Sequence, residues 1–280
     1  LENKEDDFVC YVAMVASLIS GGTYIPINNS LPLNRLKFIL LSSKANILIS
    51  KLKPSKKINI KSLSMKEILN LKKVPKVKII NSMKDAYIIY TSGSTGKPKG
   101  VRISRNALDH YIMWISKNFF QKKNLRCSQH PSIGFDLSVA DIFGTLSSGG
   151  TLFPIKNDYD KLFLNKFIKK NRLTHWISVP SAVDLVFDQD YFKKNDVKSL
   201  ENMFFCGEVL KKIHLQKIFR SNKNVKVMNS YGPTEATVSC TSIVFNKNNY
   251  QKYCKPSASF GKPIKNMKIG FLSKKKVTQG

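Results

Sequence analysis

Residues 90–100 read YTSGSTGKPKG, with three glycines, four serine or threonine hydroxyls and two lysines. The apolar run AYIIY (residues 86–90) precedes this loop and predicts a strand that leads into it. Glycines permit the positive φ angles of a tight wrap, and N–H groups and hydroxyls can converge there on an anion. Taken alone, the stretch fits a flexible surface turn equally well.

This loop is not a Walker A motif, which has four residues between its glycines and a serine or threonine after its lysine. Here two residues separate Gly93 from Gly96, and Pro98 follows Lys97. The rest of the chain must therefore decide what the loop binds.

The chain alternates short apolar runs with helical stretches, which predicts an α/β fold with mostly parallel sheets. Residues 8–20 read as a buried helix that stops at two glycines. The predicted strands are residues 23–27, 45–50, 86–90, 174–179, 202–206 and 225–229. Further helices are predicted at residues 103–120, where Ser104 is the expected cap, and at residues 161–171 and 210–221.

The net charge of +29 suggests nucleic-acid binding, but the kind of basic residue argues against it. Only six of the 47 basic residues are arginines, and the lysines are spread along the chain, most densely over residues 51–84. We expect a solvated basic surface and no nucleic-acid partner. No apolar run reaches the roughly 18 residues of a membrane span, so no membrane insertion is expected.

The five cysteines contain no CxxC pair, which disfavours both a disulfide framework and a zinc site. A reduced cytoplasm is the simpler setting. The four histidines lie far apart without ligand spacing, and we expect structural roles for them.

Three more segments follow or end predicted strands, as loops at the carboxyl edge of a parallel sheet should: GFDLS (134–138), FFCGEVL (204–210) and NSYGPTEATV (229–238). Together with TSGSTGKPKG they resemble the adenylate-forming enzymes, and within them the amino-acid adenylation domains. The sequences of these segments are most similar to those of the ligases that load D-alanine onto a carrier protein. The last part of the chain, FGKPIKNMKIGFL, is more similar to a peptide-synthetase module. The resemblance implies the large N-terminal core domain, with αβαβα layers, truncated at both ends. It thus implies that residues 1–280 are a partial AMP-binding domain without the small C-terminal domain.

The implied reaction joins an amino-acid carboxylate to the α-phosphorus of ATP and releases pyrophosphate, mainly through positioning and charge stabilisation. The catalytic residues would be Thr234, at the α-phosphate, and Glu235, which would bind Mg²⁺. By resemblance, the β- and γ-phosphates would lie against Thr91, Ser92, Gly93, Ser94, Thr95, Gly96 and Lys99. The adenine would lie against Asn229, Tyr231 and Gly232, with Gly207 and Glu208 beside it. A lone tyrosine in a turn or a lone glutamate in a first helical turn would need no such role.

Asp136 bears on the substrate class, because the family pairs this carboxylate with the substrate's α-ammonium. It could also cap the helix expected near Leu137. Asp141 is expected on the surface of that helix. The implied pocket is small and uncharged, which favours D-alanine, although Cys206 could equally be an ordinary buried strand residue. The pocket residues carried over by resemblance are Leu137, Ala140, Ser178, Phe204, Cys206, Ser230 and Val238.

Several alternatives stay open. The chain could be a peptide-synthetase module for another small amino acid, or a catalytically inactive nucleotide-binding fragment. Acyl-CoA synthetases of the same superfamily do not need Asp136, and a nucleic-acid binder fits least well. Since the family continues beyond VTQG, we expect this chain alone to bind ATP weakly and to form the adenylate slowly or not at all. The second half-reaction would transfer the aminoacyl group to a phosphopantetheinylated carrier protein.

Overall fold

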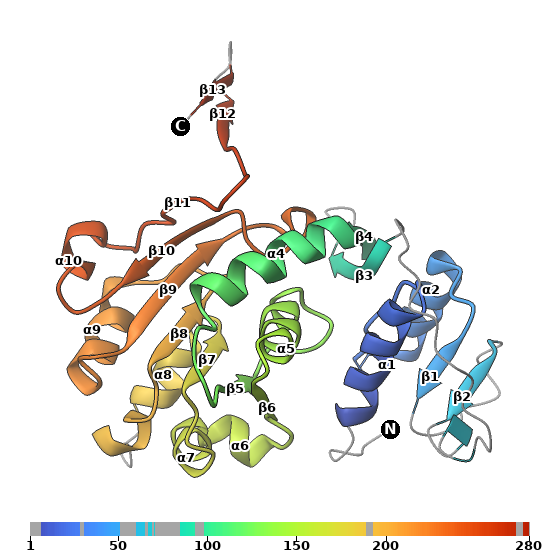
Figure 1. Cartoon of the computed structure of the whole chain (residues 1–280), viewed down its shortest axis with the longest axis horizontal. Helices are drawn as coiled ribbons and strands as arrows, with labels where there is room; N and C mark the ends of the chain where they lie inside the picture. Colours follow the sequence, from blue (N-terminus) through green and yellow to red (C-terminus); the bar gives the residue numbers. More distant parts are fainter. Residues whose placement is uncertain are drawn as a thin grey trace. The chain divides into compact units, whose positions relative to one another are not determined.

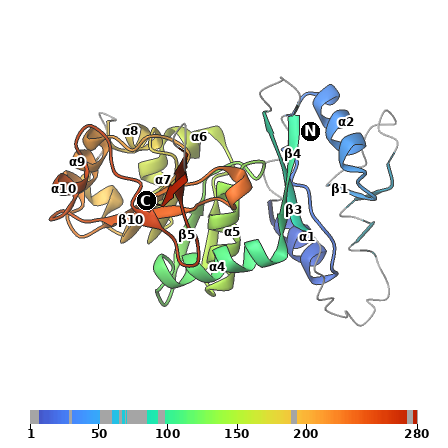
Figure 2. The ribbon, with the colours of Figure 1, turned by 90° about the horizontal axis from the view of Figure 1, so that it is seen from above.

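The computed structural model describes residues 7–28, 31–50, 60–64, 67–68, 70, 85–92, 98–188, 193–272 and 277–279. Contacts divide the chain into two compact units (Figures 1 and 2). Unit 1 comprises Leu1–Leu108 with Ser132–Gly134, and unit 2 comprises Asp109–Pro131 with Phe135–Gly280. No described helix is long and apolar enough to cross a membrane.

Unit 1 is built from two helices and two strand pairs. Helix α1 (Asp7–Ile19) ends as predicted before two glycines, and α2 (Leu33–Ser43) follows it. Strands β1 (Leu48–Ser50) and β2 (Ser62–Ser64) pair in parallel. Strands β3 (Asp85–Ser92) and β4 (Pro98–Ser104) form an antiparallel pair. The strand predicted at residues 23–27 is wrong in extent, since only Tyr24 makes a bridge there, to Tyr87.

Unit 2 is built around a seven-stranded sheet in the order β11-β10-β9-β8-β7-β5-β6. The five strands from β9 to β6 are parallel, and β10 and β11 continue the sheet antiparallel. The fold is thus α/β with a mostly parallel sheet, as predicted. Its strands are β5 (Arg126–Gln129), β6 (Thr151–Pro154), β7 (His175–Ser178), β8 (Asn202–Phe205), β9 (Lys226–Tyr231), β10 (Thr241–Phe245) and β11 (Lys262–Pro263).

Helices cover both faces of this sheet. Successive side chains of a strand point to opposite faces, and apolar side chains on both faces pack against helices. Trp176 and Phe205 pack in the core formed with α7, α8 and α9, whereas His175 and Phe204 meet Phe119 at the end of α4. Figure 2 shows α4 and α5 on the side away from α8 and α9. The helices are α4 (Arg105–Asn118), α5 (Leu137–Ser147), α6 (Asp158–Leu162), α7 (Leu164–Lys170), α8 (Ala182–Phe187), η1 (Lys194–Val197), α9 (Lys212–Ser221), η2 (Thr234–Ala236) and α10 (Tyr250–Tyr253).

Two helix predictions are refined by the structure. Ser104 caps α4 as expected, since its hydroxyl accepts a hydrogen bond from the Ala107 amide. The single helix predicted at residues 161–171 divides into α6 and α7 at Phe163, whose backbone (φ −114°, ψ 52°) is not helical. A final antiparallel pair, β12 (Gly270–Leu272) with β13 (Val277–Gln279), ends the described chain.

Candidate functional site

The glycine loop of unit 1 connects two antiparallel strands. Thr91 lies opposite Lys99 and Ser92 lies opposite Pro98 at the open end of the β3–β4 pair. β3 and β4 therefore form a β-hairpin. The prediction that the glycine loop lies at the edge of a parallel sheet is wrong for these strands. Four of the candidate phosphate-binding residues lie outside the described residues: Gly93, Ser94, Thr95 and Gly96.

In unit 2, the other three motif segments do meet at one edge of the sheet. Residues 135–138, the part of the first segment that belongs to unit 2, follow β5, residues 204–210 begin on β8, and residues 229–238 begin on β9. These strands are parallel, so their carboxyl ends lie at the same edge, where α/β proteins place their ligand sites. The sequence correctly predicted this common edge.

Asp136 immediately precedes α5, but its side chain makes no capping hydrogen bond, so the capping role considered for it is wrong. Burial raises the pKa of its carboxyl group and the nearby Glu235 adds to the rise, while hydrogen bonds from the Thr234 hydroxyl and the Leu137 amide oppose it. No cation forms an ion pair with Asp136 among the described residues. The carboxyl group is therefore suited to receive a cation from a ligand.

Glu235 is an exposed carboxylate on η2, close enough to Asp136 to influence its pKa. The described residues contain no group of three metal-binding side chains. Mg²⁺ is commonly held by one or two carboxylates together with substrate phosphates and water, so Glu235 fits that ion in the presence of a nucleotide.

The predicted pocket residues around Asp136 are buried. Cys206 lies against the Val238 carbonyl at 3.7 Å and the Ser239 hydroxyl at 4.0 Å, and burial, with the nearby Asp136, raises the pKa of its thiol to about 12. The thiol is thus protonated at neutral pH, and Cys206 is a small uncharged residue rather than a nucleophile. Leu137, Ala140, Phe204 and Ser230 are also buried, and the Ser230 hydroxyl donates to the Thr241 carbonyl.

Ser178 is connected differently. Its hydroxyl lies 2.9 Å from His130 Nδ1, which also accepts a hydrogen bond from Trp176 Nε1 at 3.4 Å. Ser178 meets Cys206 through the backbone, since the Cys206 amide donates to the Ser178 carbonyl. The structure thus groups the Ser178 hydroxyl with Trp176 and His130. Burial lowers the pKa of His130 to about 4, in keeping with the structural role expected for it.

Backbone strain concentrates just after η2. Thr237 and Val238 have φ of 60° and 68°, values that β-branched residues rarely adopt. The backbone of Gly232 packs against this turn, because a Cβ there would lie 2.6 Å from Ser239 Cα. Close packing and the hydrogen bond from the Cys240 amide to the Tyr231 carbonyl hold the turn in place.

The candidate adenine-binding residues divide into two kinds. Tyr231 keeps 51% of its surface exposed, and Gly207 has a φ of +91° that favours glycine, so both can offer ring or backbone to a ligand. The other two are engaged within the protein: the Asn229 amide donates to the Ser259 carbonyl, and the Glu208 carboxylate accepts from the amide and hydroxyl of Ser181. The sequence did not predict these two partnerships.

Asp141 corrects a prediction, because it is fully buried rather than on the helix surface. Burial raises the pKa of its carboxyl group well above the ordinary value, and neither carboxyl oxygen has a hydrogen-bond partner among the described residues. It sits beside Cys127, whose pKa burial also raises. Asp141 is thus a neutral interior group on the face of α5 that packs against β5.

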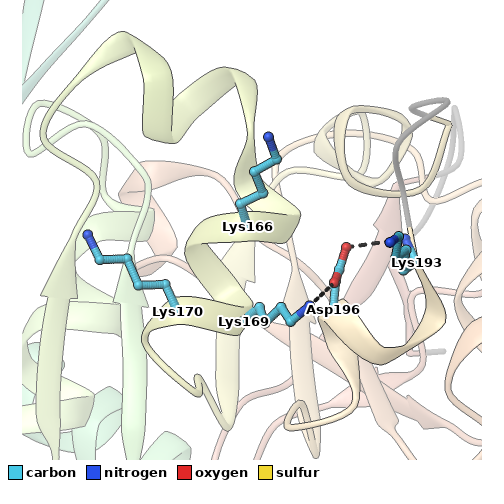
Figure 3. A pocket seen from close by; sticks show the side chains of 5 residues that line it. All are labelled: Lys166, Lys169, Lys170, Lys193 and Asp196. Atoms are coloured by element: carbon cyan, nitrogen blue, oxygen red, sulfur yellow. Dashed lines mark hydrogen bonds and ion pairs between the residues drawn. The ribbon is translucent and has the colours of Figure 1, made fainter.

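A basic hollow lies at the opposite edge of the sheet (Figure 3). The segments that form it, α7 and η1, precede the amino ends of β7 and β8. Among the described residues that line it, Asp196 is the only acid, and it is paired with Lys169 at 3.0 Å. The lining residues are Lys166, Lys169, Lys170, Lys193 and Asp196.

Residues 9–277 match the family model described as "AMP-binding enzyme". The chain is 33% identical over 261 residues to the D-alanine--D-alanyl carrier protein ligase of Listeria monocytogenes serotype 4a, covering 89% of this chain and 51% of that protein. The ligase of the same name from Lactococcus lactis subsp. lactis is 29% identical over 275 residues, with coverages of 95% and 55%. The chain spans about half the length of these curated relatives.

Solved structures show the same fold. The Vibrio cholerae adenylation domain AlmE, in complex with glycyl-adenosine-5'-phosphate, superposes with a TM-score of 0.81 at 24% identity, covering 98% of this chain and 57% of that chain. IdnL7 superposes with a TM-score of 0.80 at 21% identity, with coverages of 96% and 58%. At these identities the likeness concerns the fold alone.

Proposed function

Since the chain belongs to the AMP-binding enzyme family, we propose that it activates a small amino acid, with D-alanine favoured, as an aminoacyl-adenylate. The amino acid would then pass to a phosphopantetheinylated carrier protein, in line with the names of the relatives. The observation that carries the proposal is Asp136, a half-buried carboxyl group with a raised pKa and no cationic partner among the described residues.

In the first step, a carboxylate oxygen of the amino acid attacks the α-phosphorus of ATP. A new P–O bond forms, the bond to the β-phosphate breaks, and pyrophosphate leaves. Asp136 would hold the α-ammonium, which fixes the distance of the attacking carboxylate from the phosphorus. The Thr234 hydroxyl, which hydrogen-bonds to the Asp136 carboxyl group, would orient the α-phosphate. Thr234 would thus connect the residue that holds the amino acid to the nucleotide.

The nucleotide would be held by residues of three kinds. Thr91, Ser92 and Lys99, with the glycine loop between them, would bind the β- and γ-phosphates. Tyr231 would stack on the adenine, with the Gly207 and Gly232 backbones beside it. Glu235 would bind Mg²⁺, which neutralises phosphate charge when it is bound.

The pocket supports a small uncharged side chain. Leu137, Ala140, Phe204, Cys206 and Val238 are buried and carry no charge at neutral pH. An acidic or basic side chain would have no counter-charge there, which is costly in a buried site. In the second step, the carrier thiol would attack the acyl carbon, forming a thioester and releasing AMP. We place this chemistry in the cytoplasm.

Amino-acid-dependent exchange of pyrophosphate into ATP tests the proposal. D-alanine, L-alanine, glycine and serine should support exchange, with D-alanine the best substrate, and glutamate and phenylalanine should not. Binding of AMP, measured in parallel by calorimetry, reports on the nucleotide site without turnover. A clear preference for a large or acidic amino acid would contradict the small pocket, and exchange driven by fatty acids would favour an acyl-CoA synthetase.

A further inference from the structure

Residues 257–260, which we call the bridging segment, contain none of the candidate site residues, and they contact two of the motif segments. Ser257 forms a β-bridge with Lys211, and the Ala258 amide donates to the Leu210 carbonyl at 2.8 Å. The Ser259 carbonyl accepts the side-chain amide of Asn229 at 2.9 Å. The bridging segment therefore connects the chain that follows β8 with the end of β9.

The last residue of the bridging segment, Phe260, contacts Tyr231. The ring centroids lie 4.8 Å apart with an interplanar angle of 39°, within the range of favourable aromatic pairs. Both residues stay exposed, Tyr231 by 51% and Phe260 by 47%. Aromatic surface that is left open beside a strained turn and a glycine-rich edge is typical of a ligand site.

The contact with Phe260 leaves about half of the Tyr231 surface (51%) exposed and open to a ligand. We propose that Phe260 is a positioning residue that holds the Tyr231 ring in the orientation needed to stack on the nucleobase. The inference rests on the proposed function, since it takes the ligand of Tyr231 to be a purine nucleotide.

The physical gain is preorganisation. A half-exposed tyrosine ring can sample several rotamers, and a ligand that stacks on it must immobilise it at an entropic cost. The ring contact with Phe260 restricts that freedom before binding. The backbone of the bridging segment is held by three hydrogen bonds: the Ala258 amide to the Leu210 carbonyl, the Ser259 amide to the Tyr253 carbonyl, and the Asn229 side chain to the Ser259 carbonyl. Phe260 is therefore carried by a fixed backbone.

Calorimetric titration with AMP tests the proposal in a double-mutant cycle. Phe260→Ala should raise the Kd for AMP about threefold to tenfold, as expected for the loss of an aromatic pair. Phe260→Tyr keeps the ring and should remain within twofold of the unaltered protein. Phe260→Ala should add little in a Tyr231→Leu background, because the ring that it positions is then missing.

Phe163→Ala is the matched control. Phe163 and Tyr159 form a pair of nearly the same geometry, with centroids 4.6 Å apart and an angle of 43°, near α6 and outside the motif segments. This variant should leave the Kd for AMP unchanged. Additive effects of Phe260→Ala and Tyr231→Leu, or an equal loss with Phe163→Ala, would overturn the proposal.

Nuclear magnetic resonance of the Tyr231 ring separates this inference from the proposed function. A single set of ring resonances that broadens or shifts toward an averaged position in Phe260→Ala supports positioning, and an unchanged spectrum overturns it. If the unaltered chain binds no AMP, the nucleotide site of the proposed function fails, while the spectrum still decides whether Phe260 orders Tyr231.

Discussion

The pKa of a carboxyl group is shifted in opposite directions at the two edges of the unit 2 sheet. At the carboxyl edge, burial raises the pKa of Asp136, assisted by Glu235 and opposed by the Thr234 hydroxyl. At the amino edge, the pKa of Asp196 is lowered: burial works against this, but hydrogen bonds from Lys169, the Lys193 amide and Asn165 prevail. One acid has its partners within the protein, and the other depends on what binds.

This difference separates a structural acid from a candidate binding acid. A carboxylate stabilised by protein donors gains little from a ligand, whereas one with a raised pKa gains most when a cation arrives. The surroundings agree with this division. The carboxyl edge has the positive φ angles at Thr237 and Val238, and the amino edge is a lysine-lined hollow.

The largest effect is expected from Asp136→Asn. Removing the charge leaves a substrate ammonium without its partner, and losing one member of a desolvated charge pair costs about 2–5 kcal/mol. Amino-acid-dependent pyrophosphate exchange should fall on the order of 100-fold or more, while the Kd for AMP changes little.

Asp196→Asn is the control at the other edge. It should lower the free energy of unfolding in urea and leave exchange by the folded protein unchanged. Equal losses of exchange in both variants would remove the contrast between the edges.

The next effect is a loss of stability in acid that involves both edges. His130 follows the carboxyl end of β5 and His175 begins β7, and burial lowers the pKa of each from 6.5 to about 4. The unfolded state binds more protons between these values, so this stability is complete above pH 6.5 and is lost as the pH falls toward 4. Each histidine should contribute roughly 3 kcal/mol.

Urea unfolding at a series of pH values measures this effect. A His130→Asn variant, whose Oδ1 can take the place of Nδ1 as acceptor, should lose about half of the acid dependence. A stability profile that is flat from neutral pH to about pH 4 would show that neither histidine is held neutral.

The sequence correctly predicted that three motif segments meet at one edge of the sheet, but it did not predict the pairing of β4 or the positions of individual side chains there. Motif segments that follow β5, β8 and β9 were placed correctly, because apolar strand runs and glycine-containing turns are local signals. The hairpin that carries the glycine loop was missed, since antiparallel pairing of β4 depends on contacts with β3. Asp141 and Phe260 could not be placed, because burial of an acid and contact between rings 29 residues apart arise only from tertiary packing.

A smaller effect is expected from Gly232→Ala. A Cβ at this position would lie 2.6 Å from Ser239 Cα and 2.8 Å from the Val238 carbonyl oxygen, and neither backbone atom can move without disturbing the strained turn. The variant should lose about 1–3 kcal/mol of unfolding free energy, the usual range for overpacking. It should also weaken AMP binding, measured by calorimetry. Gly149→Ala has open space around its Cβ but a φ of +67°, so it serves as a control for backbone strain without overpacking.

The smallest effect is expected from Lys169→Ala at the amino edge. The lysine is 58% exposed, so solvent screens its pairing with Asp196, and exposed pairs contribute about 0–1 kcal/mol. Asp196 keeps the Lys193 amide and the Asn165 side chain, so its carboxylate stays satisfied. Unfolding free energy should fall by less than about 1 kcal/mol, and both AMP binding and pyrophosphate exchange should stay unchanged. A marked loss of exchange in this variant would show that the basic hollow takes part in the reaction, and the functional division between the two edges would then fail.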